Sequence, residues 1–275
     1  MDLGTVPIKL QGVLDPVTEF RRDLFHRSIE PYKASLSQQN YAGTLRNEIL
    51  GAIGVNVKEN AVELMEKRRP GALDGKLIYM SSVTDPYQPV ERELQLTRGI
   101  LEIMAERHKP KLVIQTRSPL VVRDCDLLRR IEDNGGRVQV NMTVTTDDED
   151  IRRTFEPFCP SNMVRLQAVG KVQAAGVDTC ITMTPLLLVS SPYAFADSLL
   201  ATGVEKFIAQ PFHFQRGKFL AGTREAAFDL MAEKLGCDRA SFREEYMEHY
   251  RMVFGVISHM LPELGEGKTG FTPPF

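Results

Sequence analysis

The sequence predicts an α/β fold with about six strand–helix units around a parallel sheet. From residue 55 onwards, short apolar runs alternate with helical stretches, as they do in consecutive βαβ units. A doubly wound sheet that binds a dinucleotide usually carries a glycine-rich phosphate turn. No G-x-G-x-x-G lies between a predicted strand and the helix that follows it. We therefore expect a full or partial barrel.

The predicted strands are apolar runs of the length and composition typical of parallel sheets. The clearest of them, 137–145, alternates strictly between polar and apolar residues. The full set of expected strands is 55–57, 76–82, 111–116, 137–145, 177–187 and 204–209.

The predicted helices have apolar residues spaced three or four apart, and turn residues limit several of them. Pro70-Gly71 and Gly176 each follow a helical stretch, and Pro160 stands near the start of another. The expected helices are 59–68, 89–108, 124–132, 147–158, 160–175, 192–201, 223–235 and 239–260.

Composition and length are those of an ordinary globular protein. Of the 275 residues, 43% are hydrophobic and 25% charged, enough for one large domain with a filled core. We expect a single domain over 1–275, in which 1–55 is an N-terminal segment and 220–275 a C-terminal helical extension.

Charge and hydropathy exclude several classes of partner. The 34 basic and 36 acidic residues give a net charge of −2, which offers little for binding nucleic acid. No apolar stretch approaches the roughly 20 residues that span a bilayer, and we expect no signal peptide. These features favour a cytoplasmic protein without a membrane partner.

Polar residues stand at or near the carboxyl ends of five predicted strands, where barrel enzymes place their active sites. Interior positions of a barrel are normally bulky and apolar, so this repetition indicates a ligand site. The residues concerned are Ser82, Thr84, Gln115, Arg117, Asn141, Thr143, Thr182, Thr184, Gln210 and His213.

Two charged members of this group have two possible roles. Arg117 precedes Ser118-Pro119, and its guanidinium suits either a ligand carboxylate or phosphate or an ion pair with a nearby acid. Asp85 precedes Pro86 and is either a turn residue or a carboxylate that contacts a ligand or a proton.

Several segments together resemble the spore-photoproduct-lyase-like branch of radical S-adenosylmethionine (SAM) proteins. They are VKENA at Val57–Ala61, TDPYQPVE at Thr84–Glu91, TRSPLVVRD at Thr116–Asp124, and Glu156-Pro157 followed by Pro160-Ser161 and Arg165-Leu166. The tail Gly270–Phe275 is also similar. The likeness covers about 55–190 well, and implies the partial (β/α)₆ TIM-type barrel of radical SAM enzymes, with C-terminal helices.

The cysteines depart from that family. Its C-x-x-x-C-x-x-C loop holds a [4Fe–4S] cluster, and the nearest counterpart here places Ser35, Gln39 and Ala42 at the three positions. The four cysteines present are Cys125, Cys159, Cys180 and Cys237, and no two are closely spaced. We therefore expect no iron–sulfur cluster, no other metal, and no radical cleavage of SAM.

The resemblance implies a SAM site at the carboxyl ends of the strands. Arg117 would hold the carboxylate of SAM, with Ser81, Ser82 and Thr84 near its amino group. Gln115, Asn141, Thr143, Thr182 and Thr184 would line the remainder. Asp85, Tyr87, Tyr41 and His213 are the candidate acid, base or positioning groups, with Tyr41 in a segment, 35–43, that either fills the vacated cluster site or faces solvent.

Three functions follow from this interpretation. The first is an enzyme, a SAM-dependent transferase or lyase, that uses SAM or a SAM-like ligand in polar chemistry on a small-molecule substrate. The second is a non-catalytic ligand sensor or a partner of a true radical SAM enzyme. The third is a nucleic-acid lesion-binding protein, which the charge balance disfavours.

Overall fold

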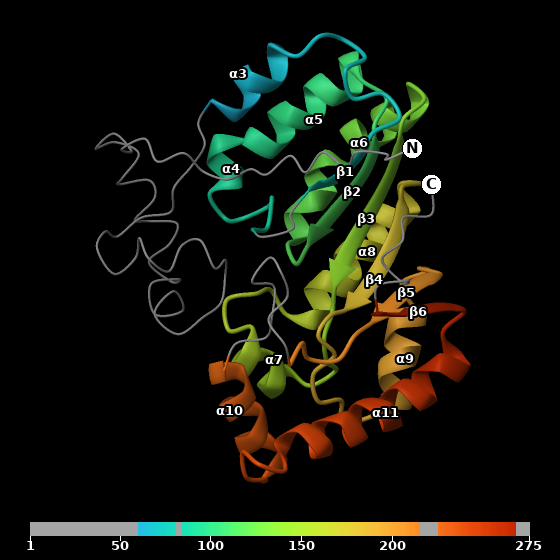
Figure 1. Cartoon of the computed structure of the whole chain (residues 1–275). Coiled ribbons are helices and arrows are strands. Elements are labelled where there is room, and N and C mark those ends of the chain that lie inside the picture. Colours follow the sequence, from blue (N-terminus) through green and yellow to red (C-terminus); the bar gives the residue numbers. More distant parts are fainter. Residues whose placement is uncertain (1–59, 81–83, 215–224, 268–275) are drawn as a thin grey trace, which may run out of the picture. The chain divides into compact units, whose positions relative to one another are not determined.

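A computed structural model of the chain describes residues 60–80, 84–214 and 225–267 (Figure 1). Six strands form one sheet in sequential order, and within the described residues this sheet is not closed. They are β1 (Leu77–Met80), β2 (Lys111–Thr116), β3 (Arg137–Thr143), β4 (Asp178–Met183), β5 (Lys206–Ala209) and β6 (Glu263–Glu266). The predicted α/β fold with a parallel sheet is confirmed: five of the expected strands correspond to β1 to β5, and the expected strand 55–57 lies outside the described residues.

Helices separate consecutive strands, as the sequence pattern predicts. The pairs β1–β2, β4–β5 and β5–β6 are parallel, with Leu77 opposite Lys111 and Cys180 opposite Lys206. The helices are α3 (Ala61–Glu66), α4 (Glu91–Leu94), α5 (Leu96–Arg107), the 3₁₀ helix η1 (Pro119–Asp124), α6 (Cys125–Asp133), α7 (Glu149–Phe155), α8 (Asn162–Ala174), α9 (Pro192–Leu200), α10 (Glu225–Leu235) and α11 (Phe242–Met260).

The chain divides into two compact units. Among the described residues, the first unit comprises 60–80, 84–141 and 174–178, and the second comprises 142–173, 179–214 and 225–267. Strands β3 and β4 therefore contribute residues to both. In the first unit α5 packs against α3 and α6, and Leu101, Met104, Leu127 and Leu128 are almost fully buried.

The long helix expected over 89–108 is interrupted at Gln95. This residue adopts a left-handed conformation (φ 49°) between α4 and α5. The carboxylate of Glu91 folds over the start of α5 and accepts hydrogen bonds from the backbone N–H of Thr97 and of Arg98. A side chain that satisfies the free amides of the second helix stabilises a separate helix start. Apolar periodicity alone does not reveal this break.

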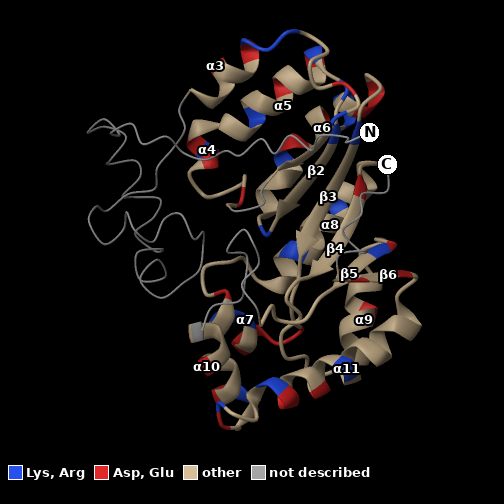
Figure 2. Ribbon diagram, viewed as in Figure 1, with Lys and Arg blue, Asp and Glu red and all other residues tan. Residues whose placement is uncertain are grey.

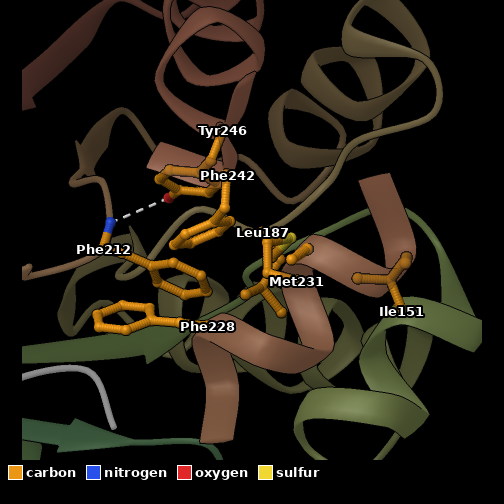
Figure 3. Close-up of a cluster of buried hydrophobic side chains, with 8 residues drawn as sticks. Ile151, Leu187, Phe212, Phe228, Met231, Phe242 and Tyr246 are labelled. Atoms are coloured by element: carbon orange, nitrogen blue, oxygen red, sulfur yellow. Dashed lines mark hydrogen bonds between the residues drawn. The ribbon is translucent and has the colours of Figure 1, made fainter. Parts of the chain in front are cut away.

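The second unit has an aromatic core formed with its C-terminal helices. In Figure 3 the rings of Phe212, Phe228, Phe242 and Tyr246 lie together beside Leu187, Met231 and Ile151. Phe212 and Tyr246 stack with their ring centroids 4.6 Å apart. These side chains come from α7, α10, α11 and the segments that follow β4 and β5. We call them the aromatic cluster.

Two smaller differences between the predicted and the observed fold concern the C-terminal part. Strand β6 was not expected, because Glu263–Glu266 follows α11 without an apolar run. The spacing G-x-G-x-x-G does occur at Gly265–Gly270, but it begins inside β6, and residues from 268 on lie outside the described ranges. No helix in the described ranges is long and apolar enough to cross a membrane.

Candidate functional site

Asp85 connects the segment after β1 to the end of β2. One of its oxygens accepts hydrogen bonds from the backbone N–H of Tyr87 (2.9 Å) and the hydroxyl of Thr116 (2.7 Å). The other accepts from the backbone N–H of Arg117 at 2.8 Å. Burial raises the pKa of Asp85, and these hydrogen bonds oppose the rise. The carboxylate thereby fixes the backbone from which the Arg117 side chain extends.

Three charged residues of the TDPYQPVE and TRSPLVVRD segments, Glu91, Arg123 and Asp124, join Arg98 and Asp126 in a network of charges. We call these five residues the motif network. Arg123 donates to both carboxylate oxygens of Asp124 at 2.8 Å and to Glu91 at 2.9 Å. Arg98 donates to Asp124 at 2.8 Å and to Asp126 at 3.0 Å. Asp124 is completely buried, so these contacts compensate its lost hydration.

Tyr87 lies beside this network. Its ring is buried, and the guanidinium of Arg123 is 6.0 Å from the ring centroid. Burial, together with the nearby carboxylate of Asp124, raises the pKa of Tyr87 well above its ordinary value. A phenol in this environment stays protonated at neutral pH and releases its proton less readily than an ordinary tyrosine, so it is suited to donate a hydrogen bond.

Uncharged polar side chains form hydrogen bonds between neighbouring strands of the first unit. Tyr79 on β1 donates to the side-chain oxygen of Gln115 on β2 at 2.9 Å, and the side-chain amide of Asn141 on β3 donates to the same oxygen at 3.3 Å. The side-chain amide of Gln139 donates to Asn141 at 2.8 Å. We call these four residues the polar ladder. Gln139 and Asn141 are both buried.

This face is unusual for a parallel sheet, whose strands are normally apolar on both sides. On the other face of β3, Val138, Val140 and Met142 are fully buried. Each of β2 to β5 begins with one charged residue and is otherwise uncharged (Figure 2). The ladder is therefore polar but neutral.

The remaining predicted contacts fall in the second unit. The hydroxyls of Thr143 on β3 and Thr182 on β4 lie 3.0 Å apart, and both residues are buried. Thr184 follows β4 and is partly exposed. His213 is exposed, and its Nε2 lies 3.1 Å from the side-chain oxygen of Gln210. The structure thus brings Thr143 together with Thr182, and His213 together with Gln210.

The Glu156–Arg165 motif forms a buried ion pair in the second unit. Arg165 is fully buried and its Nη2 lies 2.6 Å from a carboxylate oxygen of Glu156. Arg165 also donates to the carbonyl oxygens of Thr143 (3.0 Å) and Pro160 (2.8 Å). The pair therefore joins the start of α8 to the end of β3. Like the motif network, it holds a loop that follows a strand.

Several predicted site residues lie outside the described ranges. These are Ser81 and Ser82, and Tyr41 with the whole of segment 35–43, including Gln39. Thr84 is described and partly exposed. The proposed vacated cluster site therefore stays a prediction.

The cysteines of the described residues are reduced thiols. Cys159 and Cys180 are buried, and Cys125 and Cys237 are partly buried. Burial raises the pKa of Cys180 to about 12, so its thiolate form is strongly disfavoured. Over residues 60–80, 84–214 and 225–267, no three side chains of His, Cys, Asp or Glu are grouped so as to hold a metal ion.

Sequence reasoning missed three kinds of residue. Gln139 and Tyr79 extend the polar ladder, and Gln139 could have been found because it continues the alternation of Asn141 and Thr143 along β3. Glu91 and Asp124 were noticed only as parts of motifs. Tyr246 could not have been found, because nothing in the sequence of α11 indicates that its hydroxyl reaches the backbone of two loops.

Comparisons with known proteins give relatives without an assigned activity. No protein-family model matches the chain. An uncharacterized protein of Methanocaldococcus jannaschii is 35% identical over 133 residues, which are 48% of each chain. An uncharacterized protein of Mycobacterium tuberculosis is 28% identical over 188 residues, 65% of this chain and 54% of the relative. The chain thus spans about half the length of these curated relatives.

Among solved structures, spore photoproduct lyase is similar at low identity. A complex with dinucleoside spore photoproduct has 14% identity and a TM-score of 0.47, and covers 82% of this chain and 71% of the lyase. A mutant of that lyase with bound S-adenosylmethionine and the same dinucleoside has 14% identity and a TM-score of 0.48, over 77% and 67%.

Proposed function

We propose that this chain binds S-adenosylmethionine, or a compound sharing its amino-acid and adenosine halves, at the carboxyl ends of its strands. We further propose that it uses this ligand in polar transfer or fragmentation chemistry on a small molecule. The observation that carries the proposal is the position of Arg117 directly after β2, with its backbone held by Asp85. A guanidinium that extends from this fixed backbone is suited to a carboxylate.

The neutral side chains of the first unit fit the other half of such a ligand. Gln115 and Arg117 are two residues apart, so in extended chain they project from the same side. Gln115, with Tyr79 and Asn141 beside it, offers amide and hydroxyl groups to uncharged polar atoms of that half. Thr84 lies one residue before Asp85, and Thr143, Thr182 and Thr184 of the second unit stay predicted contacts.

An iron–sulfur cluster does not fit the residues present. A [4Fe–4S] cluster requires closely spaced thiolates, and the four cysteines of these 275 residues are far apart in sequence. Two of them are buried, with the thiolate of Cys180 strongly disfavoured. SAM is a sulfonium whose attached carbons are electrophilic, so transfer requires only a positioned nucleophile or base.

The roles within the site follow from the contacts above. Arg117 binds and orients the carboxylate. Asp85 acts as a positioning residue, because both of its oxygens already accept hydrogen bonds from the chain. Tyr87 stays protonated and donates a hydrogen bond, in keeping with its raised pKa. His213, which is exposed, is the candidate acid or base.

Calorimetry with SAM and S-adenosylhomocysteine tests the binding. Replacing Arg117 by Ala should weaken binding by about 2–5 kcal/mol if the contact is desolvated. Arg153→Ala is the matched control, because Arg153 is exposed and pairs only at the surface with Asp150. A wild-type protein that binds neither compound, or equal affinities for wild type and Arg117→Ala, would overturn the proposal.

Two further measurements separate the proposed enzyme from its alternatives. Anaerobic reconstitution with iron and sulfide should give no stoichiometric [4Fe–4S] spectrum, and a full spectrum would contradict polar chemistry. Mass spectrometry of SAM incubated with the protein and a cell extract of small molecules should reveal a transfer or fragmentation product. Binding without any product would instead favour the ligand sensor.

A further inference from the structure

The buried end of the polar ladder has an acceptor that the described part of the chain leaves unused. The side-chain nitrogen of Gln139 donates to Asn141 at 2.8 Å, while its oxygen, Oε1, is buried and has no hydrogen-bond partner there. Only 5% of Gln139 is exposed. Buried polar atoms are almost always paired, because an unpaired one costs about 1–3 kcal/mol.

Each hydrogen bond of the ladder has a fixed donor and acceptor, and their order explains why the oxygen of Gln139 has no partner within the ladder. Gln115 accepts from both Tyr79 and Asn141 through one oxygen. Asn141 therefore presents its own oxygen to Gln139, and Gln139 must turn its nitrogen towards Asn141. The oxygen of Gln139 is left pointing away from the ladder. The arrangement is suited to a donor that the ladder itself does not supply.

The chemical class of that donor follows from charge. Tyr79, Gln115, Asn141 and Gln139 are all neutral, and the charged residue of β3 nearest to Gln139 is the exposed Arg137, two residues before it, which is itself positive. An ammonium or guanidinium group would be desolvated there without a counter-charge. A neutral N–H, as in a carboxamide, lactam or imide, satisfies the acceptor without that cost.

We propose that Gln139, at the buried end of the polar ladder, accepts a hydrogen bond from a neutral, N–H-bearing amide-type group of the second substrate, whereas Gln115 at the other end serves the SAM-like ligand. The proposal rests on the proposed function, because it assigns the co-substrate of the same site. It divides the site by charge: Arg117 recognises the carboxylate of the SAM-like ligand, and Gln139 recognises the uncharged partner. Gln139 is thereby a specificity-determining residue.

A matched pair of small probes tests this directly. We would titrate 2-pyrrolidinone and N-methyl-2-pyrrolidinone, which differ in the single N–H, into ¹⁵N-labelled protein. The side-chain amide signals of Gln139 and Asn141 should shift saturably with the lactam. Its N-methyl derivative should bind about 2- to 12-fold more weakly, the effect of one neutral hydrogen bond. Equal shifts with both probes, or none with either, would overturn the inference, as would an enclosed water that neither probe displaces.

Two variants locate the effect. Gln139→Met retains volume without hydrogen bonding and should abolish the difference between the probes, whereas Arg117→Ala should leave it intact. Lactam discrimination that persists in Gln139→Met would assign the site elsewhere. Failure of SAM to bind while the lactam pair still discriminates would refute the proposed function alone. Binding of SAM without lactam discrimination would refute only the role of Gln139.

Discussion

The loops that follow the strands are held by ionic contacts in one part of the molecule and by aromatic packing in another. After β1 and β2, the motif network holds them with ionic contacts to the wholly buried Asp124. After β4 and β5, the aromatic cluster holds them with stacked rings and uncharged hydrogen bonds. There, Tyr246 accepts from the backbone N–H of Phe212 at 3.0 Å and donates to the carbonyl of Leu186 at 2.7 Å.

The two regions should therefore differ in the substitutions that they tolerate. A buried ionic network is costly to break, because removing one partner leaves charges without compensation. An aromatic cluster responds to lost volume or a lost hydroxyl in smaller, separable steps. The loops on the ionic side carry Arg117 and Asp85, and those on the aromatic side carry Thr184 and His213. The two sets of predicted site residues therefore depend on different interactions.

The largest expected effect is at Asp124. Replacing Asp124 by Asn should destabilise the protein by about 3–5 kcal/mol, because Arg98 and Arg123 lose their common buried counter-charge. Urea unfolding measures the change. Asp126→Asn is the matched control, since Asp126 pairs with the same Arg98 but is 56% exposed, and should cost less than about 1 kcal/mol. Similar losses in both variants would show that burial does not set the strength of this network.

A medium effect is expected at Tyr246. Tyr246→Phe keeps the stacked ring but leaves the N–H of Phe212 and the carbonyl of Leu186 unpaired. We expect a loss of about 1–3 kcal/mol in the free energy of unfolding. Tyr193→Phe is the control, because Tyr193 is exposed and should change stability by less than about 0.5 kcal/mol. An unchanged free energy of unfolding in Tyr246→Phe would mean that ring packing alone fixes these loops.

The fold could be predicted from the sequence where local pattern determines it. The strand 111–116 agrees with β2 at both ends, and the strands β1 to β5 follow from alternating apolar runs and helices. The break at Gln95 could not be predicted, because it depends on Glu91 capping a helix whose own apolar spacing is continuous. Strand β6 was missed since Glu263–Glu266 forms a strand only by pairing with β5.

The site was predictable in part for a related reason. Polar residues at strand ends are visible in the sequence, and Thr143 and Thr182 indeed meet. Their partners depend on register between strands, which the sequence does not state. Tyr79 on β1 meets Gln115 on β2, and Asp85 accepts from the backbone N–H of Arg117 as well as from the hydroxyl of Thr116. Catalytic roles for Asp85, Tyr87, Tyr41 and His213 stay predictions.

The smallest expected effect is a change in stability with pH at His249. His249 on α11 accepts a hydrogen bond from the backbone N–H of Val189 at 3.1 Å through Nε2, so this nitrogen must be unprotonated. Burial lowers the pKa of His249, and the carboxylate of Asp147 opposes this. The unfolded chain, with a histidine pKa of about 6.5, then binds more protons as the pH falls. Stability should therefore decrease as the pH falls below about 6.5, and level off below the folded-state pKa.

His249→Gln isolates this contribution, because a glutamine oxygen can accept the same hydrogen bond but does not titrate. Urea midpoints between about pH 5 and pH 8 should fall less steeply towards acid in His249→Gln than in wild type. The pKa of the buried His108 in the first unit is also lowered by burial, and its effect has the same sign in both proteins. The difference between the two curves therefore reports His249 alone. Parallel curves would show that the aromatic side of the molecule holds its loops without any titrating group.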